Sequence, residues 1–102
     1  MKSIRDTLYL ITSYSIRSGF LQKAEKYTDV GTQMFPTDQR LLELRALVLL
    51  NLERFQEAEE IVSQVETETP NVNYIKVRTS ILLNFSAEEI KNRVQKYLAT
   101  AH

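Results

Sequence analysis

The sequence predicts an all-α fold, a short α-solenoid of three helix-turn-helix units with about six antiparallel helices. Three observations predict it. Glycine and proline occur only twice each in 102 residues, and a chain with so few breakers is typically mostly helical. Apolar residues recur at intervals of three and four, the period of an amphipathic helix. Two blocks of sequence also recur at about one period, which indicates stacked repeats.

The first two helices are expected at 3–18 and 21–34. The first carries an apolar stripe and ends before Gly19, a residue suited to the turn that follows a helix. The second ends before Pro36. The stripe residues in the two segments are Leu8, Ile11 and Ile16, then Leu21, Ala24, Tyr27 and Met34.

The third and fourth helices are expected at 38–52 and 55–68. Thr37 and Asp38 can cap the third, which is apolar almost all round from 41 to 52, so both its faces require cover. Pro70 forces Thr69 out of helical geometry, which ends the fourth helix before it. The stripe of the fourth helix is Phe55, Ala58, Ile61, Val62 and Val65.

The fifth and sixth helices are expected at 72–85 and 87–100. Ser86 and Glu89 have the spacing of a capping box, in which the serine oxygen accepts from the third backbone N–H. Every predicted link between helices is short. Short links make successive helices antiparallel neighbours.

A shift of 34 residues places 21–26 on 55–60 and Pro36 on Pro70. A shift of 33 places 45–52 on 78–85, where Leu-Leu-Asn recurs. Two matched blocks at nearly one period predict a single domain, 1–102, of three units at about 3–36, 37–70 and 71–102. The last unit is degenerate, because polar residues replace the small residue of its second helix: Lys91, Asn92 and Arg93.

A 34-residue pair of helices with a small residue midway in each and a closing proline resembles the tetratricopeptide repeat. The residues that carry the resemblance are Thr12, Ala24, Gly31 and Pro36 in the first unit, and Ala46, Ala58 and Pro70 in the second. Small side chains let two helices cross at short distance, which would repay the cost of a glycine inside a helix. The sequence departs from the repeat in having no tryptophan, and in placing Arg45 and Arg78 where leucine is preferred.

The resemblance implies a right-handed solenoid in which the first helix of each unit lines a concave, protein-binding groove. Its centre would be apolar and its rim mixed in charge. The expected groove residues are Asp6, Tyr9, Ser13, Ile16 and Arg17, then Arg40, Glu43, Leu47, Leu50 and Asn51, then Asn73, Lys76, Ser80, Leu83 and Asn84. The apolar centre could be covered by a partner, by the chain's own helices or by a second copy.

Composition argues against several other classes. Thirteen basic residues balance thirteen acidic ones, whereas a nucleic-acid-binding protein needs a basic surface. There is no cysteine, and the single histidine is His102, so we expect no metal site, no cofactor and no catalytic activity. The carboxylates of Glu53, Glu57, Glu59 and Glu60 are expected to form a solvated helix face. The longest strongly apolar run, 46–50, is far too short to span a membrane, which predicts a cytoplasmic protein.

The groove lacks the lysines and asparagines with which some tetratricopeptide proteins hold a carboxylate peptide, so it favours an amphipathic helix. By size, repeat number and groove character, the chain is similar to the small chaperones of bacterial type III secretion. That resemblance implies a partner: a small helical secretion substrate or export-apparatus component, kept from aggregating before export. The alternatives are a generic adaptor module and a self-assembling structural protein that forms a homodimer.

Overall fold

The structure is a computed structural model that describes residues 3–101. In that range the chain forms six α-helices and no strand, which confirms the all-α class. The helices are α1 (Ile4–Arg17), α2 (Leu21–Met34), α3 (Gln39–Asn51), α4 (Phe55–Val62), α5 (Pro70–Leu82) and α6 (Ala87–Thr100).

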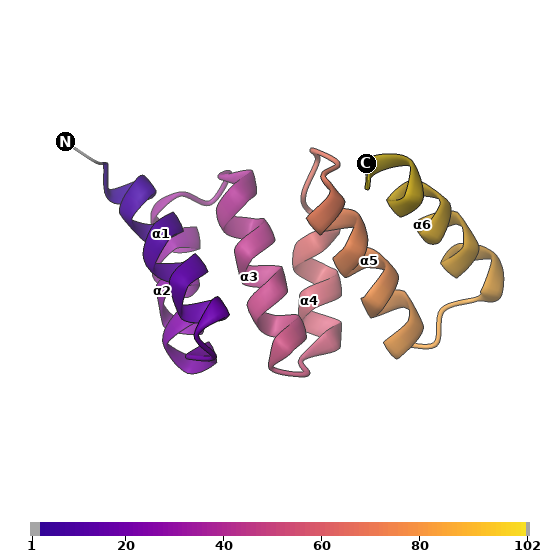
Figure 1. Cartoon of the computed structure of the whole chain (residues 1–102), viewed down its shortest axis with the longest axis horizontal. Helices are drawn as coiled ribbons and strands as arrows, with labels where there is room; N and C mark the ends of the chain where they lie inside the picture. The colour runs from indigo at the N-terminus through magenta and orange to yellow at the C-terminus, as the bar shows by residue number, and fades with distance from the viewer. Residues whose placement is uncertain (1–2, 102) are drawn as a thin grey trace.

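The helices lie in a row along an elongated molecule of 46 × 24 × 23 Å (Figure 1). Each helix packs against the next one in the chain, and α3 packs in addition against α1 and α5. Within residues 3–101 no other pair of helices packs together. The odd-numbered helices are therefore neighbours, although each is separated from the next by a whole helix in the sequence.

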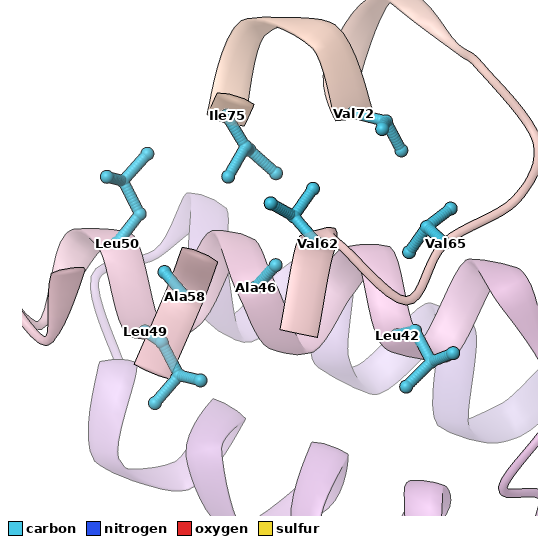
Figure 2. Packing of buried hydrophobic residues seen from close by; sticks show 9 residues of the cluster. All are labelled: Leu42, Ala46, Leu49, Leu50, Ala58, Val62, Val65, Val72 and Ile75. Carbon is cyan, nitrogen blue, oxygen red and sulfur yellow. The ribbon is translucent and has the colours of Figure 1, made fainter. Parts of the chain in front are cut away.

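The main core lies between α3, α4 and α5. Buried side chains from the three helices face one another (Figure 2), and Val65 adds one from the link after α4. Helix α3 supplies four of the nine, more than α4 or α5, because it is buried on several sides, as its nearly continuous apolar sequence predicts. The cluster consists of Leu42, Ala46, Leu49, Leu50, Ala58, Val62, Val65, Val72 and Ile75.

Small residues stand where helices approach closely. Gly31 of α2 is buried, and a Cβ atom added to it would lie 3.3 Å from both Cδ1 and Cδ2 of Leu41 on α3. Ala24, Ala46 and Ala58 are fully buried. The close approach predicted for Gly31 is thereby confirmed, and it offsets the helix propensity that a glycine forfeits.

The predicted caps are present. Asp38 accepts a hydrogen bond from the Leu41 backbone N–H at 2.9 Å, and Ser86 accepts one from the Glu89 N–H at 3.2 Å. Thr69 is extended, as Pro70 requires, and caps α5. Three predicted bounds are wrong. Helix α4 ends at Val62 rather than at 68, and α5 ends at Leu82 rather than at 85. Helix α5 also begins at Pro70 rather than at 72, because proline fits the first position of a helix.

The turns that follow α1, α3 and α5 share one hydrogen-bonding pattern. In each, a residue with positive φ closes the helix: Gly19 (81°), Glu53 (63°) and Asn84 (58°). The next backbone N–H donates to a carbonyl five residues earlier, the wrapping bond of a Schellman motif. These bonds are Phe20 to Ser15 at 2.8 Å, Arg54 to Leu49 at 2.9 Å and Phe85 to Ser80 at 2.9 Å.

The matching turns at Glu53 and Asn84 are 31 residues apart, and not the 33 of the sequence match. The shortening lies between α4 and α5, because their first residues are 15 positions apart, against 18 for α2 and α3. The match of 45–52 to 78–85 is therefore a coincidence of letters and gives the wrong register. An error of two residues turns a helical position by about 200°, onto the opposite face.

Substitutions at the turns should shift stability in opposite directions. Gly19→Ala places a side chain at positive φ with no compensating contact, so we expect a loss of about 1 kcal/mol. Glu53→Gly removes the same strain and should gain about 0.5–1 kcal/mol, reduced by the greater freedom of glycine in the unfolded chain. Urea unfolding followed by circular dichroism measures both. Destabilisation by Glu53→Gly would show that this turn is held in another way.

Candidate protein-binding groove

A hollow of about 410 Å³ lies between α1, α3 and the first turn of α5. It brings together seven of the residues predicted for the groove: Tyr9, Ser13, Ile16, Arg17, Arg40, Glu43 and Leu47. Leu10, Leu44 and Asn71 complete its lining. These seven residues come from two helices that are adjacent in space because α3 packs directly against α1.

Three residues predicted for the groove are instead buried. Leu50 belongs to the core between α3, α4 and α5, so this side chain is covered by the chain's own helices. Ser80 is fully buried and donates to the Val77 carbonyl at 2.7 Å. Asn73 is buried too, and its side-chain N–H donates to Thr100 Oγ1 of α6 at 3.1 Å.

The remaining predicted residues lie outside the lining of the hollow. Asn51 is exposed at the last position of α3, and Leu83 is half-buried just past the end of α5. Lys76 is half-buried, and its backbone carbonyl accepts from Arg93 of α6 at 2.8 Å. Asp6 and Asn84 are exposed and do not line the hollow.

The error of two residues in the predicted spacing explains why the residues predicted on α5 do not line the hollow. At the 31-residue spacing of the turns, the positions equivalent to Arg40, Glu43, Leu47 and Leu50 are Asn71, Tyr74, Arg78 and Ile81. Asn71 does line the hollow, and the other three are exposed. The sequence offered one signal for this register, namely the distance from the N-cap Asp38 to the N-cap Thr69.

Tyr9 is fixed in place at one end of the hollow. Its hydroxyl donates to the Asp38 carboxylate, which also forms an ion pair with Arg5 Nε at 3.2 Å and caps α3. The guanidinium of Arg40 lies 5.3 Å from the centre of the Tyr9 ring. Burial, together with the hydrogen bond to Asp38, raises the pKa of Tyr9 to about 12. The hydroxyl is thus engaged within the chain, and the ring is left to contact a ligand.

Glu43 is the one acidic residue that lines the hollow. Its Oε2 accepts from Thr69 Oγ1 at 3.2 Å, across to the N-cap of α5. Gln39, on the same turn of α3, accepts from the Glu66 backbone N–H at 2.8 Å. These bonds attach the segment before α5 to α3. They therefore hold together α3 and α5, which both contribute to the lining of the hollow.

A second polar cluster surrounds the carboxylate of Glu59 on α4, and here a prediction from the sequence is wrong. Glu59 does not belong to a solvated face: it is only 8% exposed. Arg93 of α6 binds it with both terminal nitrogens, Nη1 to Oε1 at 2.7 Å and Nη2 to Oε2 at 2.9 Å. Thr79 Oγ1 donates to Oε1 at 2.6 Å and Ser63 Oγ to Oε2 at 2.8 Å. Arg93 therefore links α6 to α4, two helices that do not otherwise pack together in the described chain.

The charge of Glu59 is strongly favoured in the folded protein. Burial on its own would raise the pKa of the carboxyl. The hydrogen bonds from Arg93, Thr79 and Ser63 outweigh burial, and they lower the pKa of Glu59 from 4.5 to about 2. Both oxygens of this carboxylate accept hydrogen bonds from within the chain. The cluster is therefore a structural link between helices and not a ligand-binding site.

A second apolar surface lies on α1, which is at one end of the row of helices. At a shift of 34, Leu10 and Tyr14 are equivalent to Leu44 and Val48, which are 8% and 0% exposed in the layer where α2 packs on α3. Leu10 and Tyr14 are 52% and 57% exposed because no helix precedes α1 in the described chain. With Phe20 and Tyr27 they line a hollow of about 410 Å³.

Neither a metal centre nor a membrane span is visible in residues 3–101. No group of three or more metal-ligating side chains comes together there. No helix among the described residues has both the length and the apolar character needed to cross a bilayer. His102 lies outside the described residues.

Comparison with known proteins gives no relative. The chain matches no family model, and no curated protein or solved structure matches it. The resemblance to the tetratricopeptide repeat therefore stays a prediction that rests on the residues named above. The function has to be argued from the groove itself.

The Glu59–Arg93 cluster predicts a specific dependence of stability on pH. Because the folded pKa of Glu59 is depressed, its contribution is present above the unfolded value of 4.5 and is lost as the pH falls toward 2. The full loss amounts to about 3 kcal/mol at most. We expect Glu59→Gln to remove this part of the pH dependence of the free energy of unfolding, measured in urea between pH 7 and pH 2.

The matched control is Glu60→Gln, which removes the adjacent, exposed carboxylate of α4. It should keep the pH profile of the unsubstituted chain. Equal profiles for Glu59→Gln and Glu60→Gln would contradict the role assigned to the buried carboxylate.

Proposed function

We propose that this chain is a tetratricopeptide-type chaperone that holds an amphipathic helical segment of a secreted or export-apparatus subunit. In this proposal the client helix lies in the groove between α1 and α3, remains soluble in the cytoplasm and is released for type III secretion. No catalytic step and no cofactor is involved. The function is binding alone.

The observation that carries the proposal is the character of the hollow. Its lining combines apolar side chains, among them Ile16 and Leu47, with charged ones, among them Arg17 and Arg40. A helix presents its apolar residues at i, i+3, i+4 and i+7, and such a stripe requires an apolar trough with polar edges. A volume of about 410 Å³ suits a few anchoring side chains of that stripe.

The secretion context comes from the resemblance stated at the outset, and a generic adaptor module would use the groove in the same way. The two differ in their clients and not in their chemistry. Burial of a client's apolar stripe withholds it from self-assembly, which is what distinguishes a chaperone. Solution mass of the chain co-expressed with each small helical protein of its genomic neighbourhood separates the two: a stable complex with a secretion subunit supports the chaperone.

Groove binding is tested with a helical peptide that carries leucine at i, i+3, i+4 and i+7 and glutamine elsewhere. Ile16→Asp and Leu47→Asp each replace an apolar contact that is worth about 1.5–3 kcal/mol. We expect each variant to bind the peptide at least about 10-fold more weakly, by fluorescence anisotropy. Circular dichroism checks folding, since Leu47 also packs against the core and Ile16 does not belong to it.

The matched control is Leu98→Asp on α6, an exposed apolar residue far from the lining of the hollow. It should bind the peptide as the unsubstituted chain does. Unchanged binding by folded Ile16→Asp, or equal loss in Leu98→Asp, would place the binding surface elsewhere.

A second candidate, self-assembly, is favoured by the exposed apolar end at α1. Leu10 and Tyr14 occupy positions that a helix covers in the next unit, so a second copy could cover them. Sedimentation over a range of concentrations tests this: a dimer that Tyr14→Asp dissociates would support it, and a monomer at every concentration would exclude it.

A further inference from the structure

Charge is divided unevenly between the two sets of helices. The chain as a whole is neutral. Helices α1, α3 and α5 carry six basic residues and two acidic ones, whereas α2, α4 and α6 carry five basic and seven acidic. The set that includes the groove is therefore the positive one.

The arginines fall into two groups according to whether an ion pair neutralises them. Arg5, Arg45, Arg54 and Arg93 each form an ion pair with a carboxylate. Among residues 3–101, Arg17, Arg40 and Arg78 form none, and they lie on α1, α3 and α5, one on each. All three are exposed.

Two of these arginines line the hollow, and the third has an equivalent position on α5. Arg17 and Arg40 line the hollow itself. Arg78 stands on α5 at the position that Leu47 has on α3 and Ser13 has on α1, and both of those residues line it too. Arg78 Nη1 donates to the Tyr74 hydroxyl at 2.8 Å, which holds the guanidinium on this face without neutralising it. The only carboxylate in the lining, Glu43, already accepts from Thr69.

From this arrangement we propose that the groove selects a helix whose apolar stripe is flanked by glutamate and aspartate, with Arg17, Arg40 and Arg78 pairing with those carboxylates. The inference rests on the proposed function, because it specifies the client of the same groove. Complementary charge sets the choice of partner and the orientation of the bound helix, while the apolar stripe supplies most of the affinity. A nucleic acid does not fit as well, because apolar side chains such as Ile16 and Leu47 share the lining with the arginines and would stay uncovered by a phosphate backbone.

The test uses three peptides with the same leucine stripe and matched helicity, whose flanking positions are all Glu, all Gln or all Lys. Fluorescence anisotropy at low salt should give the Glu peptide the highest affinity, at least about 10-fold above the Lys peptide. Its advantage should shrink as salt shortens the range of the electrostatic attraction. Equal affinities for all three would overturn this inference and leave groove binding intact. No binding by any of them would overturn both.

Charge-reversing variants locate the effect. Arg40→Glu and Arg78→Glu should each weaken the Glu peptide and strengthen the Lys peptide, and the double variant should invert the preference. Lys26→Glu makes the same change in charge at an exposed position of α2, outside the hollow, and should leave the ratio of affinities unchanged. Equal effects of Lys26→Glu and Arg40→Glu would show that only net charge matters, and would overturn the assignment. An unchanged ratio in Arg78→Glu would overturn the role assigned to Arg78.

Discussion

Helix α3 packs against α1, α2, α4 and α5, and the positions of these four helices follow from its burial. A helix that is apolar almost all round requires cover on nearly every side. Two helices that precede α3 and two that follow it provide this cover. Gly31 of α2 lets α2 approach α3 closely, because it has no side chain. Arg40, Glu43 and Leu47 of α3 stay at least partly exposed, and they form one wall of the groove. The proposed binding surface is thus formed in part by the residues of the central helix that packing leaves accessible.

Helix α6 is the exception, because it packs against α5 alone and has no fully buried residue. Polar contacts hold α6 in place where apolar packing is lacking. Arg93 reaches Glu59 on α4 and the Lys76 carbonyl on α5, and Asn73 donates to Thr100 near the end of α6. A buried ion pair is costly to form but costlier to break on one side only, so it fixes where α6 lies more firmly than it stabilises the fold. The position of α6 is thus determined by a few hydrogen bonds, whereas that of α3 is determined by the apolar surface it buries.

Local signals in the sequence predicted much of this structure. The caps at Asp38 and Ser86, the apolar periods and the breakers placed six helices, and seven groove residues were found on α1 and α3. What failed depended on relations between distant residues. The recurring Leu-Leu-Asn suggested a period of 33, whereas the turns at Glu53 and Asn84 are 31 residues apart. Two of the residues predicted for the groove on α5, Asn73 and Ser80, are therefore buried. Glu59 could not be told from its exposed neighbours either, because its partner Arg93 lies 34 residues further along the chain.

The arrangement in a row also bears on how the chain folds and opens. Almost every contact joins helices that are adjacent or next but one in the sequence, so little loop entropy is lost before contacts form, and topology of this kind favours rapid folding. Stability is then a sum over neighbouring interfaces and not a property of the whole. Amide hydrogens of α3, shared by four interfaces, should exchange with solvent most slowly, and those of α6 most rapidly. The protein can therefore fray at its carboxyl end while the wall of the groove stays intact.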